Sequence, residues 1–182
     1  MGIKFLNLKE NKKYEKQIKK LYIKSFPKEE RAPYIILKML AKKEKANFCV
    51  IKDDEKFVGL IYNIFYKDIV YVFFFAIDDS LRGQGYGSIV LKELQNKYAK
   101  KRIILMIEEL DEKRDNYKER VKRKEFYEKN GFKDFNYKIK EMGVIYQMLG
   151  CSEKVSKEEY LELMKNYFGK FLFKMVYERI NK

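Results

Sequence analysis

The chain has 182 residues, of which 46% are hydrophobic, and this suits one domain with an ordinary core. Its formal net charge is +14, and it contains two cysteines and no histidine. Ser–His–Asp and Cys–His triads are therefore excluded, as are histidine-ligated and all-cysteine zinc sites, so we expect no metal site. The chemistry must then use carboxylates, tyrosine, lysine or backbone amides.

The basic residues are spread along the whole chain rather than gathered in one stripe, so we expect no nucleic-acid partner. No apolar run approaches the roughly 20 residues of a membrane helix. The first stretch, MGIKFLNLKE, also lacks the apolar region of a signal peptide. These features predict a cytoplasmic protein that does not associate with membranes.

Hydrophobic periodicity predicts strands and helices mixed along the chain. In the first half we expect a strand over 3–8, helices over 14–25 and around 36–40, two strands joined by a turn at 53–55, and a buried strand over 69–77. In the second half we expect a helix over 85–100, a strand over 102–109, a helix over 117–130 ended by Gly131, and a hairpin over 132–149. Ser156 and Glu159 have capping-box spacing and open a last helix that ends at Gly169, whereas 171–180 is ambiguous between strand and helix.

Three glycines, Gly83, Gly85 and Gly87, follow the buried strand in the stretch FFFAIDDSLRGQGYGS and precede an amphipathic helix. The first amides of a helix have no partner within it, and the helix dipole places partial positive charge there. Glycine lets the backbone approach a ligand closely and adopt a positive φ. The pattern therefore predicts a cradle for a pyrophosphate group.

Three cofactor classes compete for this cradle. A P-loop would need Lys followed by Ser or Thr after the glycines, and the chain does not have this pair. A dinucleotide site would need glycine where Ser88 stands, although the acidic pair Glu108 and Glu109 lies near the expected offset. A nicotinamide cofactor therefore stays an alternative, and the third class is coenzyme A.

The stretch LRGQGYGS resembles the pyrophosphate motif of the GNAT superfamily of N-acetyltransferases, Arg/Gln-x-x-Gly-x-Gly/Ala, through Arg82, Gly85 and Gly87. The later stretch EFYEKNGF resembles the second signature of that family, and the helix–strand–helix interval between the two is also the family's. The resemblance covers residues 3–149. It implies a mixed α/β fold with a central, mostly antiparallel sheet flanked by helices, acetyl-CoA as cofactor and an amine as acceptor.

The resemblance also implies where the cofactor lies. Its pantetheine arm would run beside the strand over 69–77, a backbone N–H near 74–76 would polarise the thioester carbonyl, and its pyrophosphate would rest on the amides from 82 to 88. Arg120 stands where many family members carry Asn, and it shares a helix face with Arg123, so both could reach phosphates. The cofactor-binding residues expected from these features are Phe75, Ala76, Ile77, Arg82, Gly83, Gln84, Gly85, Tyr86, Gly87, Ser88, Arg120 and Arg123.

Acyl transfer to an amine needs a base for the amine and an acid for the leaving thiolate. Tyr127 matches the general acid of the family. The candidate bases are Glu108 and Glu109, at the end of a strand, and Glu29 and Glu30, in the proline-containing loop, with a water chain as another option. Glu108 and Glu109 also belong to an acidic run over 108–112, which would attract a cationic amine.

We therefore expect an N-acetyltransferase domain over residues 1–149 and a C-terminal helical extension over 150–182, packed on the same domain. The expected reaction is direct transfer of acetyl from acetyl-CoA to a primary amine on a small molecule or a peptide. The alternatives are a non-catalytic acyl-CoA sensor or scaffold of the same fold, a nicotinamide-binding enzyme and a nucleic-acid-modifying or nucleic-acid-binding protein. The sequence leaves a homodimer open.

Overall fold

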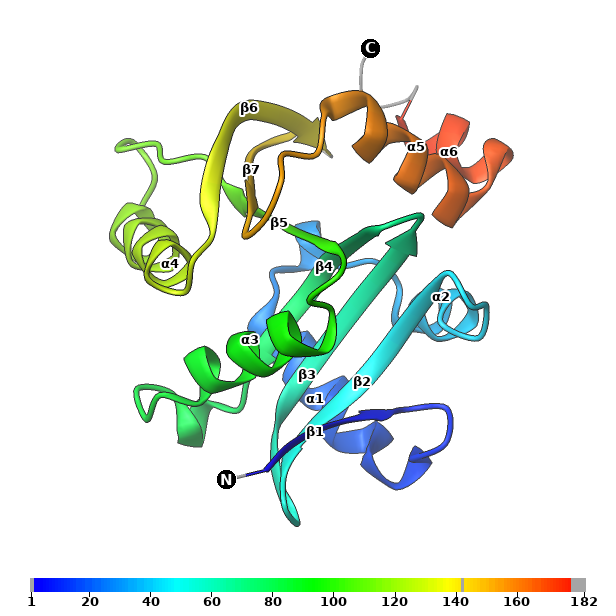
Figure 1. Ribbon diagram of the computed structural model, residues 1–182, viewed down its shortest axis with the longest axis vertical. Coiled ribbons are helices and arrows are strands. Elements are labelled where there is room, and N and C mark those ends of the chain that lie inside the picture. Colours follow the sequence, from blue (N-terminus) through cyan, green and yellow to red (C-terminus); the bar gives the residue numbers. More distant parts are fainter. Residues whose placement is uncertain (1, 142, 178–182) are drawn as a thin grey trace. The chain divides into compact units, whose positions relative to one another are not determined.

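A computed structural model describes residues 2–141 and 143–177 of the chain (Figure 1). Its seven strands form one sheet in the order β1-β2-β3-β4-β5-β7-β6, mostly antiparallel with one parallel pair. The strands are β1 (Ile3–Asn7), β2 (Ala46–Asp53), β3 (Lys56–Tyr66), β4 (Ile69–Ile77), β5 (Arg102–Glu108), β6 (Lys133–Glu141) and β7 (Val144–Gly150). This mixed sheet with flanking helices confirms the predicted fold class.

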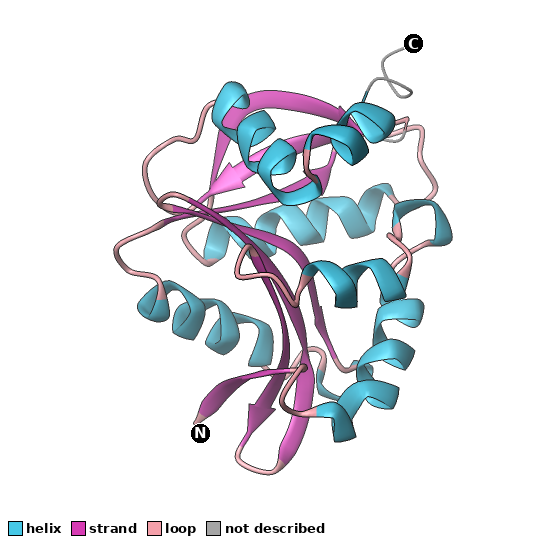
Figure 2. Cartoon of the chain, turned by 90° about the vertical axis from the view of Figure 1, so that its right-hand side faces the viewer, coloured by secondary structure: helices cyan, strands magenta, loops and turns pink. Residues whose placement is uncertain are grey.

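Helices and strands are mixed along the chain. Figure 2 distinguishes the helices from the strands by colour. The α-helices are α1 (Glu15–Ser25), α2 (Tyr34–Leu40), α3 (Tyr86–Lys97), α4 (Tyr117–Lys129), α5 (Lys157–Phe168) and α6 (Lys170–Tyr177). Short 3-10 turns add η1 (Lys12–Tyr14), η2 (Lys28–Glu30) and η3 (Asp79–Leu81). Among the described residues, no helix is both long and apolar enough to span a membrane.

The contacts divide the chain into two compact units. The first contains the chain up to Phe65 together with Val72–Lys97. Within it, β1 pairs antiparallel with β2, and β2 pairs antiparallel with β3, with an irregularity at Ile51/Lys52. Its core is formed by fully buried aliphatic side chains such as Val50, Leu60 and Val90.

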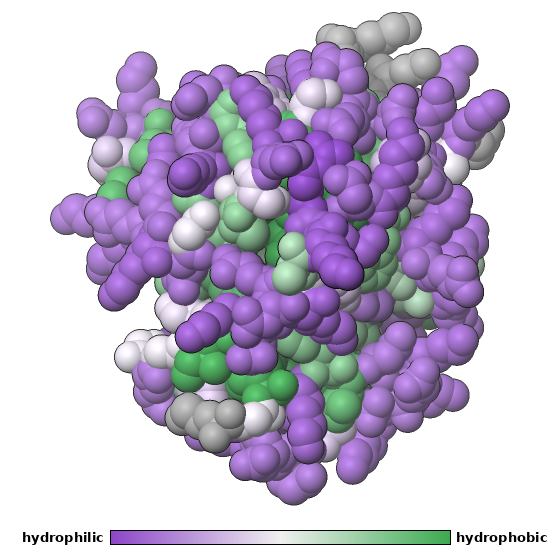
Figure 3. Space-filling model, in the orientation of Figure 1, coloured by the Kyte–Doolittle hydropathy of each residue, from purple (hydrophilic) through white to green (hydrophobic). Residues whose placement is uncertain are grey.

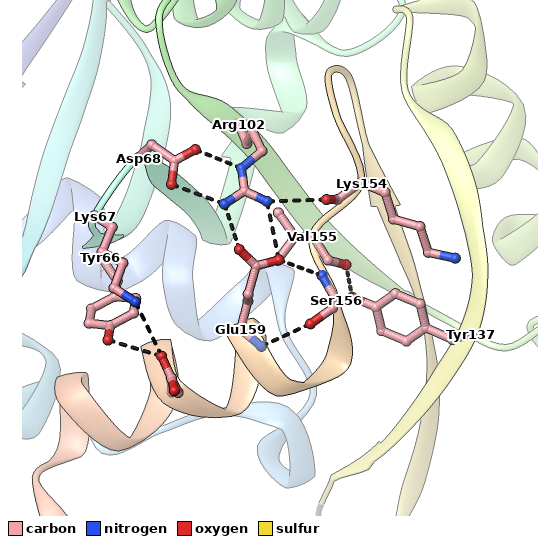
Figure 4. Close-up of polar contacts among 10 residues, drawn as sticks. Tyr66, Lys67, Asp68, Arg102, Tyr137, Lys154, Val155, Ser156 and Glu159 are labelled. Atoms are coloured by element: carbon pink, nitrogen blue, oxygen red, sulfur yellow. Dashed lines mark hydrogen bonds and ion pairs between the residues drawn. The ribbon is translucent and has the colours of Figure 1, made fainter.

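The second unit contains Tyr66–Tyr71 and the chain from Tyr98 onward. Within it, β5 and β6 both pair antiparallel with β7. Arg102 at the start of β5 connects three segments of this unit (Figure 4). Its Nε atom lies 2.7 Å from Asp68 Oδ2, and its Nη2 atom lies 2.7 Å from Oε1 of Glu159 on α5. Because the Arg102 side chain is only 17% exposed, this network fixes α5 to β5.

The ends of several helices follow the sequence signals. Ser156 and Glu159 form both bonds of the predicted capping box at the start of α5. Gly131 ends α4 with a φ of +85°, as a left-handed C-terminal stop requires. The ambiguous segment after Gly169 is helical through Tyr177, and its remaining residues lie outside the described part of the chain.

The predicted hairpin is present as β6 and β7, although residue 142 of its turn also lies outside the described part of the chain. The division into a domain over 1–149 and an extension over 150–182 stays a prediction.

One glycine determines how closely β3 approaches the end of β4. A Cβ atom on Gly59 would lie 2.2 Å from the carbonyl oxygen of Ala76, so no other residue fits at position 59 without moving the backbone. The Asp78 amide also donates to the Val58 carbonyl at 2.9 Å. The backbone that leads into the glycine-rich loop is therefore held firmly against β3.

Candidate active site

The glycine-rich loop of the first unit lies between β4 and α3. Gly83 and Gly85 have φ values of +76° and +83°, which side chains with a Cβ rarely adopt. A Cβ atom at either position would meet no atom within 4 Å. Both positions therefore require glycine for their backbone conformation, and the space beside the loop is open.

The backbone amides of this loop are available to a ligand. Ser88 and Ile89 donate to the Gly85 carbonyl at 3.1 and 3.2 Å, and these bonds start α3. In the described part of the chain, the amides at positions 83, 85, 86 and 87 donate to no backbone carbonyl. Residues 82–85 are exposed. Unpartnered amides at the positive end of a helix fit an anion such as the pyrophosphate of coenzyme A.

Polar side chains hold the approach to the loop. Arg82 pairs through Nη2 with Asp79 Oδ1 at 2.8 Å, and Gln84 donates through Nε2 to the Ser80 carbonyl at 2.8 Å. The Asp78 carboxylate accepts from the Ser80 amide at 3.1 Å. Because the Arg82 side chain remains 56% exposed, its guanidinium can still contact a phosphate.

The other predicted cofactor residues of the first unit lie at the end of β4. Ala76 is buried, whereas Phe75 and Ile77 are half-buried. The carbonyl of Ala76 faces Gly59 on β3. Tyr86 contributes its backbone to the loop, but its side chain is buried in the first unit and is only 5% exposed.

In the second unit, the structure brings together three residues that the sequence assigned to two different roles. Glu108 is 5% exposed at the end of β5. Its Oε1 atom lies 2.8 Å from Arg120 Nη2, and its Oε2 atom lies 2.5 Å from Arg123 Nη1. Arg120 also donates to the Glu109 carbonyl at 2.7 Å and to Asn116 Oδ1 at 2.9 Å. The two arginines therefore fix α4 to the end of β5.

The rest of the acidic run is also paired in the structure. Glu109 forms an ion pair with Lys138 on β6, and Asp111 pairs with Arg114 at 3.3 Å. Glu112 is exposed. Local pairing offsets most of the negative charge on which the expected attraction of a cationic amine depends. The sequence could not show this, because Lys138 is far from Glu109 along the chain.

Tyr127 lies in the last part of α4, partly buried. Its ring packs edge to face against Phe126 and Phe132, with centroid separations of 5.2 and 5.7 Å. Burial raises the pKa of Tyr127 to about 12, against a smaller lowering by Arg123. Within the described residues, its hydroxyl has no hydrogen-bond partner from the protein. At neutral pH the hydroxyl is therefore protonated.

The remaining candidate bases, Glu29 and Glu30, lie in η2 of the first unit, and Glu30 is half-buried. Its amide donates to the Pro27 carbonyl at 3.1 Å, which closes the turn before α2. Glu30 and the glycine-rich loop thus belong to one unit, whereas Tyr127, Glu108 and Glu109 belong to the other.

The comparison with family models agrees with this geometry. A model described as an acetyltransferase (GNAT) domain matches residues 44–134, which is 91 of the 182 residues. The chain belongs to the GNAT family of acetyltransferases. No curated protein matches the chain in sequence.

Solved structures of GNAT proteins are similar to the chain over most of its length. A protein from Bacteroides thetaiotaomicron assigned as a GNAT acetyltransferase is 22% identical, with a TM-score of 0.73 over 95% of this chain and 98% of its own. An aminoglycoside 6'-N-acetyltransferase complexed with coenzyme A is 18% identical, with a TM-score of 0.62 over 86% and 100%. The ribosomal-protein-S18-alanine N-acetyltransferase from Escherichia coli is 16% identical, with a TM-score of 0.59 over 86% and 97%. At these identities the likeness establishes the GNAT fold.

Proposed function

We propose that this GNAT protein transfers an acetyl group from acetyl-CoA directly to a primary amine. The observation that carries the proposal is the exposed loop at the start of α3, with two left-handed glycines and four amides that donate to no backbone carbonyl among the described residues. When bound there, acetyl-CoA would supply the activated acetyl group as a thioester. The acceptor would be a small molecule or a peptide with a free amine.

The residues of the first unit fit the cofactor. The backbone from Arg82 to Ser88 would hold the pyrophosphate, with the Arg82 guanidinium as a further phosphate contact. The backbone of 75–77 would hold the pantetheine arm, as the family resemblance implies. The position of this backbone is fixed by the close contact between Gly59 and Ala76.

Tyr127 is proposed as the general acid. Because burial raises its pKa to about 12, the hydroxyl keeps its proton throughout the pH range in which an amine acceptor becomes neutral. Its hydroxyl would stabilise the charge that develops on the departing sulfur by donating a hydrogen bond to it. Complete proton transfer to a free thiolate would be uphill, since a thiol is a stronger acid than this tyrosine.

The base is proposed among Glu109, Glu30 and water, with Glu108 in a different role. Both carboxylate oxygens of Glu108 are occupied by arginines, so accepting a proton would break at least one ion pair. We propose that Glu108 positions Arg120 and Arg123, and through them α4, which carries Tyr127.

The proposal also includes a cytoplasmic location. Cys49 and Cys151 are both free thiols, as expected of a protein from a reducing compartment.

The test is release of free thiol from acetyl-CoA in the presence of a panel of amines: polyamines, aminoglycosides, amino acids and peptides with free N-termini. We expect thiol release that depends on both acetyl-CoA and one class of amine. Binding of acetyl-CoA without release for every amine would support the non-catalytic acyl-CoA sensor instead. Thermal stabilisation by NAD but not by coenzyme A would overturn both the acetyltransferase proposal and the acyl-CoA sensor alternative.

A further inference from the structure

A buried carboxylate connects the turn between β2 and β3 to the glycine-rich loop. Asp53 is the last residue of β2 and is only 9% exposed. Its Oδ2 atom accepts a hydrogen bond from the Tyr86 hydroxyl at 3.1 Å, and its Oδ1 atom accepts from the Gly2 amide at 2.9 Å. A carboxylate buried to this extent needs such donors, and here one of them comes from the loop.

Tyr86 has a special place in that loop. It stands between Gly85 and Gly87 and is the first residue of α3. The two loop residues with left-handed backbone, Gly83 and Gly85, have no side chain that could hold the loop. Tyr86 supplies a large side chain there, and it is 5% exposed with Lys56 Nζ 5.2 Å from its ring centroid. The orientation of the loop amides therefore depends on how firmly this ring is held.

We infer that Asp53 is a positioning residue for acetyl-CoA: through the Tyr86 hydroxyl it fixes the amides that receive the pyrophosphate. This inference rests on the proposed function. A flexible glycine loop would lose conformational freedom when it binds an anion, and that loss weakens binding. A bond that already orders the first residue of α3 reduces the loss. The Tyr86–Asp53 bond should therefore strengthen binding of the nucleotide half of the cofactor and not of the acetyl group.

The test uses the Tyr86→Phe variant, which removes one hydroxyl and keeps the buried ring. We expect the Kd for coenzyme A, measured by titration calorimetry, to rise by about tenfold, as the loss of a hydrogen bond to a charged group allows. The KM for acetyl-CoA should rise similarly while kcat changes little. With acetyl-pantetheine, which lacks the pyrophosphate and the nucleotide, kcat/KM should equal that of the wild type. A general loss of folding would instead lower activity with both thioesters.

Tyr62→Phe is the matched control. Tyr62 is fully buried in the same unit, and its hydroxyl donates at 3.2 Å to the carbonyl of Leu37 on α2 rather than to a group that contacts the loop. It should lower the melting temperature about as much as Tyr86→Phe and leave the Kd for coenzyme A unchanged. In an Asp53→Ala background, Tyr86→Phe should cause no further loss of affinity, since the two residues act through one bond.

The outcomes separate this inference from the proposed function. If the wild type binds coenzyme A and Tyr86→Phe binds it equally well, Asp53 has no positioning role and the inference is wrong, while the proposed function stands. An equal loss with acetyl-CoA and acetyl-pantetheine would also overturn it. If the wild type binds no coenzyme A, the proposed function fails first.

Discussion

The proposed chemistry depends most on the hydroxyl group of Tyr127. We expect Tyr127→Phe to lower kcat by about 10²–10⁴-fold, the usual contribution of a general acid. Its affinity for coenzyme A and its melting temperature should change little, because the change removes one hydroxyl and almost no volume. Steady-state kinetics measure kcat, and thermal unfolding of the same preparation with and without coenzyme A measures the other two quantities. A variant with the kcat of the wild type would mean that water supplies the proton.

The raised pKa of Tyr127 gives this role a pH signature. An unperturbed tyrosine ionises near 10.0, whereas burial raises this pKa to about 12. A general acid loses its function as pH rises through its pKa, so the wild-type rate should show no tyrosine-dependent decline between pH 9 and about 11. The charge of Arg123 lowers this pKa, so a variant without that charge should show any decline in rate at a still higher pH. A kcat profile that falls near pH 10 in the wild type and not in Tyr127→Phe would show that the hydroxyl is not shielded from water.

Glu108 and Glu109 can be compared through matched Glu→Gln variants. If Glu108 positions α4, Glu108→Gln should lower the melting temperature, because the buried arginine Arg120 loses its charge partner. The rising limb of the pH–rate profile should stay at the same pH. Glu109→Gln should have little effect on stability, since the Glu109–Lys138 pair is more exposed. Disappearance of the rising limb in Glu108→Gln would identify Glu108 as the base after all.

The residue types of the candidate site could be predicted from the sequence, but their pairings could not. Glu108, Arg120 and Arg123 stand out as charged residues at a strand end and on a helix face. Whether an arginine on that face binds a phosphate or a glutamate depends on how α4 lies against β5. Asp53 gave no signal at all, because an acidic residue before a tight turn is ordinary.

Among the elements, the turn from β4 into α3 carries the cofactor prediction. Acetyl-CoA should raise the melting temperature of the wild type and not that of Gly85→Glu, where a carboxylate would repel the pyrophosphate. Gly169→Glu is the matched control, because Gly169 also has a left-handed φ, +78°, with no atom within 4 Å of a Cβ, and it lies between α5 and α6. Both variants should lose similar stability without ligand, and only Gly85→Glu should lose the response to acetyl-CoA. Equal responses in the two variants would remove the assignment of the loop.

The network around Arg102 should make α5 sensitive to acid (Figure 4). Hydrogen bonds from Arg102 hold the pKa values of Asp68 and Glu159 below their ordinary values. A depressed carboxyl pKa stabilises the fold above the unfolded-state value, and this stabilisation is lost as pH falls through the folded-state pKa. The melting temperature of the wild type should therefore fall below about pH 4.5, and that of Arg102→Gln should start lower and depend less on pH. If the melting temperatures of the wild type and Arg102→Gln fell in parallel with pH, the Arg102 network would not be the cause of the acid sensitivity.

Most elements could be predicted from the sequence because their signals are local. The apolar run of β4, the capping box of α5 and Gly131 after α4 each depend on a few neighbouring residues. The segment that forms α6 could not be assigned, since a short run of apolar and aromatic residues suits a strand as well as a helix. The close approach of Gly59 to Ala76 depends on pairing between strands, which a single sequence does not reveal.

On the scale of the whole molecule, charge is spread widely and paired locally. Figure 3 shows hydrophilic side chains over most of the face in view. Many lysines and arginines have a carboxylate partner, as Lys24 does in Asp79 and Lys38 in Glu15. The 27 acidic residues offset only part of the charge of the 41 lysines and arginines, which leaves the net charge of +14.

The whole fold should lose stability at alkaline pH, because several buried or half-buried thiol and phenol groups ionise less readily in the folded chain. Burial raises the pKa of the Cys49 thiol from 9.0 to about 11, and it also raises the pKa values of Tyr22, Tyr34 and Tyr137 above 10.0. The unfolded chain releases these protons at lower pH than the folded chain does. The stabilisation is therefore complete below the unfolded-state values and is lost as pH rises toward the folded-state values.

For Cys49 alone, the free energy of unfolding should fall by about 1.4 kcal/mol per pH unit between roughly pH 9 and 11. Denaturant titrations from pH 8 to 11 under reducing conditions measure this slope. Cys49→Ala should be less stable at pH 8, because it leaves a cavity in the core of the first unit, but its stability should fall less steeply with pH. Cys151→Ala is the control, since that thiol is less buried and its variant should keep the wild-type slope. If all three proteins lose stability in parallel, the tyrosines rather than Cys49 govern alkaline unfolding.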